Sequence, residues 1–248
     1  MTFVAGSAPL GGASFAVLLP SFSGRDPPTR PAMSHDLSLR RHDLVFLSAE
    51  AWRALVEQRG DLAGEALLVG WVDRGWPLIA RRPFPGEMAG LPLGLPLPPS
   101  HGKRRLALTL PRDAVQSIAP PPPLRAASSV APASWLPTLE RLLALDADVR
   151  VYGSLAWQCL TGLDYLTARS DLDLLVGLPS AGEAPRLIAE LAAIERSAPM
   201  RLDGELVRHD GAGVNWRELR EGATEILVKT LHDASLQETR CFLDGASP

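Results

Sequence analysis

Residues 170–178, SDLDLLVGL, constrain the fold of this 248-residue chain more than any other segment. Apolar residues alternate there with Asp171 and Asp173, and side chains two apart on a β-strand point to the same face. The two carboxylates therefore project together, with Cα atoms about 7 Å apart, while leucine and valine occupy the opposite face. Burying such a pair is costly unless water, a cationic side chain or a metal ion compensates its charge. The segment thus predicts a strand whose polar face binds something.

The pattern of apolar residues around this strand predicts an α+β fold for the C-terminal half. Helices are expected over 134–145, 155–163 and 179–196, and strands over 149–152, 170–178 and 200–210. The first and third helices should each bury one apolar face, formed by Leu136, Leu139, Leu142, Leu143 and by Leu187, Ile188, Leu191, Ile194.

The N-terminal half predicts a smaller α+β unit. A strand is expected over 43–47, followed by a helix that Ser48 caps and Gly60 ends. Residues 66–84 contain two apolar runs around the turn sequence DRG and predict a hairpin. The Pro- and Gly-rich sequence LPLGLPLPPSHGKRR at 91–105 predicts a stiff loop that carries cations, and a strand follows over 105–110.

Proline marks the expected division of the chain. Four consecutive prolines, 120–123, favour extended polyproline structure over helix or sheet. We therefore expect a disordered extension over 1–32, an α+β domain over 33–119, a Pro-rich linker over 120–132 and a catalytic domain over 133–248. Because globular patterning begins at Met33, translation is expected to start there and not at Met1.

Composition and charge argue against several classes of function. The formal net charge of -3 does not suit a broad basic surface for nucleic acid. Cys159 and Cys241 lack the spacing of a disulfide scaffold or a zinc site. The first 30 residues have the wrong charge order for a secretory signal, and no segment is apolar for long enough to span a membrane. We expect a cytoplasmic protein without nucleic-acid or membrane partners.

The aspartate pair favours metal and phosphate chemistry. A divalent cation, Mg²⁺ (or Mn²⁺), would offset the repulsion between the two carboxylates, because it prefers hard oxygen ligands. Gly153 and Ser154 precede the pair at a strand–helix junction, where glycine lets the backbone approach a phosphate and the helix offers free N–H groups. The alternative is that the aspartates merely flank a turn at a sheet edge.

A third carboxylate is expected from the strand over 200–210. Asp203 and Glu205 share one face of that strand, so either completes a carboxylate triad if the strand neighbours SDLDLLVGL. The sequence alone does not set the register. We prefer Asp203 and keep Glu205 as the alternative.

These motifs together resemble a known superfamily. GlySer, a helix, Asp-x-Asp on the next strand and an acidic residue on a later strand are similar to the DNA polymerase β-type nucleotidyltransferases. The longer sequence VYGSLAWQCLTGLDYLTARSDLDLL resembles the phosphoribosyl-dephospho-CoA transferases of malonate decarboxylase, also called holo-acyl-carrier-protein synthases. RRHDLVFL, WPLIARRP, LPLGLPLPPSHGKRR and VNWREL are similar to segments of that family, so the resemblance covers most of residues 39–230.

The resemblance implies a nucleotidyltransferase-like mixed sheet and a reaction. Enzymes of this family transfer phosphoribosyl-dephospho-CoA from a triphosphoribosyl-dephospho-CoA donor to a serine of the apo acyl-carrier subunit and release pyrophosphate. By resemblance, Asp171, Asp173 and Asp203 (or Glu205) would be the catalytic metal ligands, and the third acid would also help to deprotonate the serine. Gly153 and Ser154 would contact the leaving pyrophosphate. The candidates for neutralising phosphate charge are Lys103, Arg104, Arg105, Arg81, Arg82 and Lys229.

Other interpretations are weaker but remain open. The same fold could transfer a nucleotide, for example from ATP, to another acceptor, or it could be an inactive module that binds a nucleotide or partner. Ser154 lacks the Gly-x-Ser-x-Gly context of a hydrolase nucleophile. Trp157 and Trp216 could stack on adenine, although tryptophans in such segments more often belong to the core.

Overall fold

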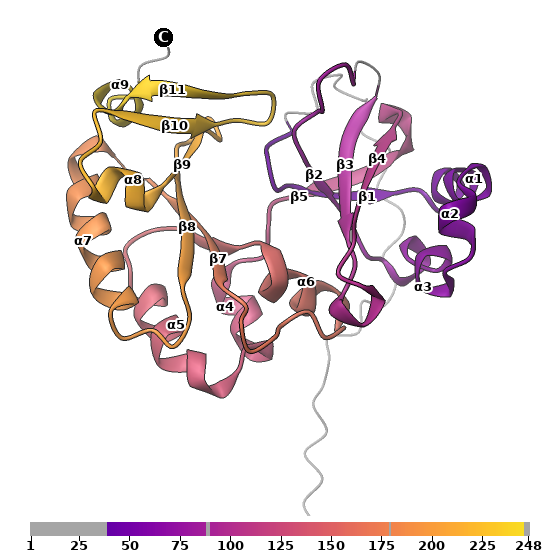
Figure 1. Cartoon of the computed structure of the whole chain (residues 1–248), viewed down its shortest axis with the longest axis horizontal. Coiled ribbons are helices and arrows are strands. Elements are labelled where there is room, and N and C mark those ends of the chain that lie inside the picture. Colours follow the sequence, from indigo (N-terminus) through magenta and orange to yellow (C-terminus); the bar gives the residue numbers. More distant parts are fainter. Residues whose placement is uncertain (1–38, 88–89, 179, 246–248) are drawn as a thin grey trace, which may run out of the picture. The chain divides into compact units, whose positions relative to one another are not determined.

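Two β-sheets with helices packed against them form the described part of the chain, which confirms the expected α+β class (Figure 1). The computed structural model describes residues 39–87, 90–178 and 180–245. The expected extension over 1–32 and the start at Met33 lie outside the described residues. The boundaries expected at 119, 132 and 133 stay a prediction.

The first sheet has the strand order β4-β3-β2-β1-β5, and all its neighbouring strands run antiparallel. Its strands are β1 (Leu44–Leu47), β2 (Leu78–Ala80), β3 (Leu91–Pro96), β4 (Arg105–Leu110) and β5 (Val115–Ala119). Its helical segments are α1 (Ala49–Gln58), α2 (Gly60–Ala63), α3 (Ala66–Val69) and the 3₁₀ turns η1 (Val72–Arg74), η2 (Pro99–His101) and η3 (Arg112–Ala114). As expected, Ser48 caps α1, where its hydroxyl accepts from the backbone N–H of Ala51 at 3.2 Å.

Two expectations for this half were wrong. The first half of the expected hairpin over 66–84 is helical, because Leu68 and Trp71 recur at helical spacing and are both fully buried. The indole N–H of Trp71 donates to the carbonyl of Pro77, directly before β2, at 3.0 Å. The expected loop over 91–105 begins with β3, since leucines at every second position face the core while Pro92 and Gly94 face away.

The second sheet has the order β11-β10-β9-β8-β7-β6 and is mixed. Strands β7 and β8 are parallel, and every other neighbouring pair is antiparallel. Its strands are β6 (Val149–Val151), β7 (Leu172–Gly177), β8 (Leu202–Val207), β9 (Gly213–Asn215), β10 (Glu225–Lys229) and β11 (Ala234–Glu238). Its helices are α4 (Leu124–Ala127), α5 (Leu136–Leu143), α6 (Gly153–Thr161), α7 (Ala184–Glu195), α8 (Trp216–Arg220) and α9 (Thr239–Leu243), with 3₁₀ turns η4 (Ser128–Val130), η5 (Ala133–Trp135) and η6 (Ala181–Glu183).

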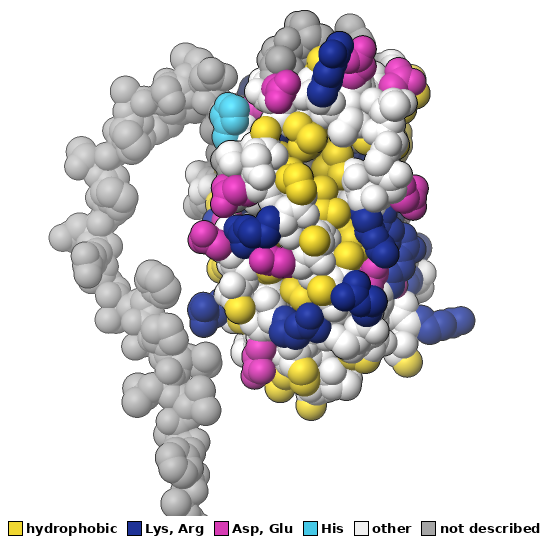
Figure 2. Space-filling view, turned by 90° about the vertical axis from the view of Figure 1, so that its left-hand side faces the viewer, with side chains coloured by type: hydrophobic (Ala, Val, Ile, Leu, Met, Phe, Trp, Pro, Cys, Tyr) yellow, Lys and Arg dark blue, Asp and Glu magenta, His cyan; other side chains and the backbone are white. Residues whose placement is uncertain are grey.

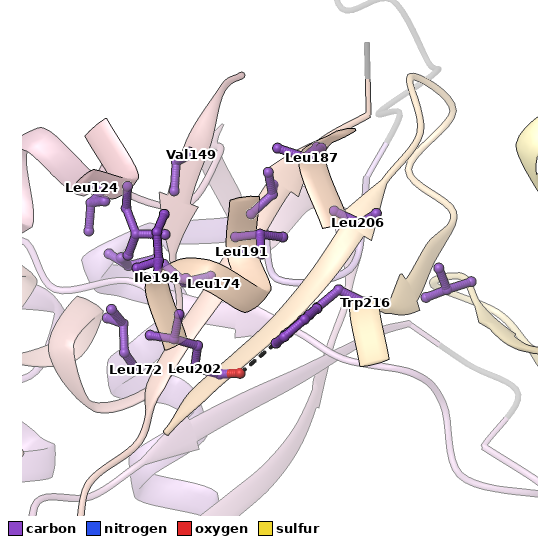
Figure 3. Packing of buried hydrophobic residues seen from close by; sticks show 14 of the residues in the cluster. Leu124, Val149, Leu172, Leu174, Leu187, Leu191, Ile194, Leu202, Leu206 and Trp216 are labelled. Atoms are coloured by element: carbon purple, nitrogen blue, oxygen red, sulfur yellow. Dashed lines mark hydrogen bonds between the residues drawn. The ribbon is translucent and has the colours of Figure 1, made fainter. Parts of the chain in front are cut away.

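Leucines from β7, β8 and α7 interdigitate in the core of this second sheet (Figure 3). Leu172 and Leu174 of β7 are fully buried, which leaves the alternate positions of the strand free for the aspartates. Trp216 packs at the edge of this core, and its indole N–H donates to the carbonyl of Leu202 at 3.2 Å (Figure 3). Burial of one strand face thus fixes the direction in which Asp173 points.

The segment over 120–132 packs against the second sheet. It contains α4 and η4, and both Leu124 and Ala127 are fully buried in that core. The carbonyl of Pro122 accepts from the N–H of Val151 at 2.9 Å, next to the residues that lead into α6.

Charged and apolar side chains share the surface seen in Figure 2. Lys and Arg side chains are interspersed with Asp and Glu around an exposed band of hydrophobic side chains. Among the described residues, none of the helices combines the length and apolar character needed to cross a membrane.

Candidate functional site

A pocket of about 570 Å³ is lined by residues of both sheets. Strands β3 and β4 supply one wall, and the first turn of α6 and the start of β7 supply another. Asp171, Asp173, Gly153 and Ser154 all line it. The structure therefore brings together the aspartate pair and the glycine bend that the sequence analysis singled out.

The third carboxylate lies beside the pair in the sheet. Asp173 and Asp203 are direct partners in the parallel ladder of β7 and β8, which run side by side in Figure 1. Directly opposed residues of neighbouring strands have side chains about 5 Å apart. This register puts Asp203, and not Glu205, next to Asp173.

The carboxylate of Asp173 presses against the backbone of Gly153. A Cβ atom at residue 153 would lie 1.8 Å from Oδ2 and 2.6 Å from Cγ of Asp173. Gly153 also has φ +63°, a left-handed conformation that favours glycine. The bend into α6 and the carboxylate therefore fit together only without a side chain at position 153.

Asp173 carries an electrostatic penalty in the absence of a cation. Burial, together with the negative charges of Asp203 and Asp171, raises the pKa of Asp173 to about 7. The backbone of Ser154 and the charge of Arg105 act in the opposite direction but do not cancel these effects. A bound cation would relieve this penalty.

Arginines flank the carboxylates away from the pocket. The Arg201 guanidinium lies 4.0 Å from Oδ2 of Asp171 and 3.8 Å from Oδ1 of Asp203. Arg217 also lies 3.8 Å from Oδ1 of Asp203, and Asn215 donates its amide N–H to that oxygen at 3.3 Å. Asp203 thus keeps its orientation through loose polar contacts.

Glu205 has a different environment. It is 4% exposed, forms an ion pair with Arg41 of the N-terminal half and accepts from Nζ of Lys229 at 3.2 Å. Burial favours its neutral form, but the charge and hydrogen bond of Arg41 and the charge of Lys229 outweigh burial and lower its pKa. Both Glu205 and Lys229 are therefore already partnered, which disfavours Glu205 as a metal ligand and Lys229 as a free phosphate contact.

The other cations expected to meet phosphate fall into three cases. Lys103 and Arg105 line the pocket with the carboxylates. Arg104 forms an ion pair with Glu65 instead, and neither it nor Arg82 contributes to the pocket lining. Arg81 lines the pocket but its guanidinium is held by both carboxylate oxygens of Glu87, at 2.6 and 2.7 Å.

Several pocket residues were missed by the sequence analysis. Arg169 lines the pocket two residues before Asp171, and its position in the ARSD sequence was the available signal. His42 has φ +73° and stacks on Tyr152 with ring centroids 4.2 Å apart. Burial, with the charge of Arg41, lowers the pKa of His42 to about 3, so the imidazole is neutral. Nothing in the sequence pattern places His42 against the bend at Gly153.

Both tryptophans raised as candidates for adenine stacking are core residues. Trp157 is 3% exposed and touches the pocket only as part of its wall, and Trp216 is 1% exposed and does not line it. The core interpretation of these residues is therefore the better one.

The donor set fits a hard divalent cation. Asp171 and Asp173 supply carboxylate oxygens that face one pocket, and burial, together with the charges of Asp203 and Asp171, raises the pKa of Asp173, so a cation beside it would favour its ionised form. Within the described ranges, no three His, Cys, Asp or Glu side chains form a group that could hold a metal ion, so the expected triad of Asp171, Asp173 and Asp203 is not assembled, and Asp203 does not line the pocket. An open site of one or two carboxylates completed by water and substrate phosphate is the usual arrangement for Mg²⁺.

Family models match most of the chain. The model of the phosphoribosyl-dephospho-CoA transferase MdcG N-terminal domain matches residues 40–121, and that of the MdcG C-terminal domain matches residues 123–240. These ranges contain the first and second sheets, respectively.

Curated relatives agree with the family models. A phosphoribosyl-dephospho-CoA transferase of Bradyrhizobium diazoefficiens is 53% identical over 223 residues, which is 88% of this chain and 99% of the relative. The enzyme of the same name from Xanthomonas axonopodis pv. citri is 37% identical over 79% of this chain and 92% of its own length. No solved structure matches the chain.

Proposed function

Since this chain belongs to the phosphoribosyl-dephospho-CoA transferase family MdcG, we propose that it attaches a phosphoribosyl-dephospho-CoA group to a serine of the apo acyl-carrier subunit of malonate decarboxylase. The donor in this proposal is 2′-(5″-triphosphoribosyl)-3′-dephospho-CoA. The observation that carries the proposal is the placement of Asp171 and Asp173 in one pocket against the bend at Gly153. A cytoplasmic location belongs to the same proposal.

The proposed reaction is a displacement at phosphorus. The carrier serine oxygen attacks the α-phosphorus of the donor triphosphate, a new P–O bond to serine forms, and the bond between the α-phosphorus and the β-phosphate oxygen breaks. Pyrophosphate leaves, and the serine proton passes to a base. Catalysis of such a transfer consists mainly of positioning and charge neutralisation, so no covalent enzyme intermediate is required.

Each site residue has a role that its position supports. Gly153 and Ser154, at the N-terminus of α6, line the pocket, and a helix N-terminus is suited to bind phosphate oxygens. Lys103 and Arg105 are suited to neutralise phosphate charge from the opposite wall. Asp203, in register with Asp173, is our candidate for accepting the serine proton.

Asp171 and Asp173 would hold Mg²⁺ or Mn²⁺. Asp203 as a third ligand rests on the family resemblance and on its register with Asp173, and its side chain would have to turn toward the pocket to bind the ion. When bound, the cation would neutralise charge that develops on the transferring phosphate. The pair would stay ionised in its presence, because a positive charge favours the carboxylate form over the acid.

Intact-mass analysis of the apo carrier subunit tests the proposal. The carrier is incubated with this protein, Mg²⁺ and either the triphosphoribosyl donor or ATP. We expect a mass increase equal to the phosphoribosyl-dephospho-CoA group, at the serine, with the first donor only. A mass increase with ATP alone would support a different nucleotidyl transfer, and no increase with either donor would contradict the proposal.

A further inference from the structure

A second pocket, of about 400 Å³, lies against the same face of β7 and β8. Leu175 and Gly177 of β7 line it, and alternation places them on the face of the strand that bears Asp173. Gly177 lies four positions beyond Asp173 along the strand, or about 13 Å away. His42 lines both pockets, so they adjoin each other along one face of the sheet. The proposed reaction makes no use of this second pocket.

Arginines dominate the polar lining of the second pocket: Arg40, Arg41, Arg150 and Arg208. Arg40 donates from Nη2 to the carbonyl of His209 at 2.7 Å, and its stem packs over Gly211, which has φ +88°. Within the described part of the chain, no carboxylate lies within ion-pair distance of the Arg40 guanidinium. Its charge is thus held in place by a neutral acceptor.

The charges of the lining leave a positive excess. The acidic lining residues are Asp43, Asp148 and Glu205, against four arginines, of which Arg208 is paired with Asp210 outside the lining. Glu205 is shared between Arg41 and Lys229, which is not part of this pocket. Arg150 is paired at 2.7 Å with Asp148, whose side chain is 62% exposed and can turn away into water. An anion in this pocket could therefore bind Arg40 and Arg150 with only the loss of the exposed ion pair between Arg150 and Asp148.

We infer that the second pocket binds the 5′-diphosphate of the dephospho-CoA portion of the donor, with Arg40 and Arg150 as its contacts. This inference rests on the proposed function. The donor carries two polyphosphates. The triphosphate is on the 5″ carbon of the added ribose, which is attached at the 2′ position of the adenosine, and the diphosphate is on the 5′ carbon of the adenosine. Only the triphosphate reacts and needs the carboxylate pocket. The diphosphate remains intact, and guanidinium groups without a metal suit it, because arginine donates paired hydrogen bonds to phosphate oxygens.

Calorimetric titration with two ligands, each representing one part of the donor, measures binding to the two pockets independently. Dephospho-CoA carries the diphosphate without the triphosphate, and inorganic tripolyphosphate with Mg²⁺ represents the triphosphate. We expect Arg40→Gln and Arg150→Gln each to weaken dephospho-CoA binding about tenfold or more, the scale of a lost charged hydrogen bond, and to leave tripolyphosphate binding unchanged. Asp173→Asn should do the reverse. Asp148→Asn should tighten dephospho-CoA binding, because it releases Arg150 from its partner.

Arg186→Gln is the matched control, since Arg186 is an exposed arginine of α7 that pairs with Glu183 and Glu190 outside both pockets. It should change neither titration. The inference is overturned if wild-type protein does not bind dephospho-CoA, if the Arg40 and Arg150 variants bind it as wild type does, or if Asp173→Asn weakens it equally. Transfer to the carrier is measured in parallel with the complete donor. Absent transfer by wild type contradicts the proposed function, whereas transfer whose KM is unchanged in both arginine variants contradicts only this inference.

Discussion

Gly153 and Asp173 are in such close contact that a Cβ atom on the glycine would stand 1.8 Å from a carboxylate oxygen. The contact joins the bend before α6, our proposed phosphate contact, to the strand that carries the carboxylates. In the proposed function, phosphate binding and cation binding would therefore depend on one local geometry.

Gly153→Ala should abolish transfer, because the new methyl group displaces the Asp173 carboxylate. The matched control is Gly162→Ala at the other end of α6. Gly162 has a similar φ of +71°, but no atom lies within 4 Å of the point that a Cβ would occupy, so its variant bears the backbone strain of about 1 kcal/mol without the clash. Gly153→Ala should lose at least as much stability in thermal unfolding as Gly162→Ala, because it adds the clash to the same strain, and only Gly153→Ala should lose transfer. Equal activity of the two would contradict the role of this contact.

Asp173→Asn should lower the transfer rate by at least about 100-fold without destabilising the protein. The amide removes a charge that repels Asp203 and Asp171, so the variant should be as stable as wild type or more stable in metal-free buffer. Added Mg²⁺ should raise the melting temperature of wild type only. A variant that unfolds, or one that keeps a near-normal rate, would count against the metal role.

The raised pKa of Asp173 predicts how stability depends on pH in the metal-free protein. The unfolded carboxyl ionises near 3.8 and the folded one near 7, so the unfolded chain releases its proton first as pH rises. Stability should therefore fall between about pH 4 and 7, by up to about 1.4 kcal/mol per pH unit from this group, and level off above pH 7. Denaturant titrations across this range should show the slope in wild type and a smaller slope in Asp173→Asn. Identical slopes would contradict the assignment.

The ion pair between Arg41 and Glu205 connects the N-terminal half to β8. Because Glu205 is almost fully buried, Glu205→Gln leaves the Arg41 charge without its partner and should cost about 3–5 kcal/mol of unfolding free energy. The exposed ion pairs of Arg186 give the comparison, since Arg186→Gln should change stability by less than about 1 kcal/mol. Chemical denaturation measures both. A small loss in Glu205→Gln would mean that the pair does not hold the two halves together.

Local patterns were sufficient to predict the elements around the site. Alternation in SDLDLLVGL fixed both the strand and the face of Asp171 and Asp173, because a slip of one residue would bury the aspartates in the leucine core. The same reasoning failed over the first half of 66–84 and over 91–96. There, the turn residues and prolines suggested a hairpin and a loop, while burial of Trp71 and of alternate leucines required helical turns and a strand.

Contacts between distant segments could not be predicted from local patterns. Which of Asp203 and Glu205 lies beside Asp173 depended on strand register, which the parallel pairing of β7 with β8 supplies. The sequence could not show that Lys103 and Arg105 line the pocket while Arg104 pairs with Glu65. His42 lines both pockets and packs against Tyr152, and neither contact could be predicted from the RRHDLVFL sequence in which it lies.

The central claim is that Asp171 and Asp173 hold a divalent cation. Its most direct test is Mn²⁺ binding, measured as the decrease of the free-ion signal in electron paramagnetic resonance. Wild type, Glu205→Gln and Gly162→Ala should bind the ion with similar affinity, whereas Asp171→Asn and Asp173→Asn should bind it at least about tenfold more weakly. Equal binding by wild type and both aspartate variants would show that the ion is held elsewhere and would contradict the account.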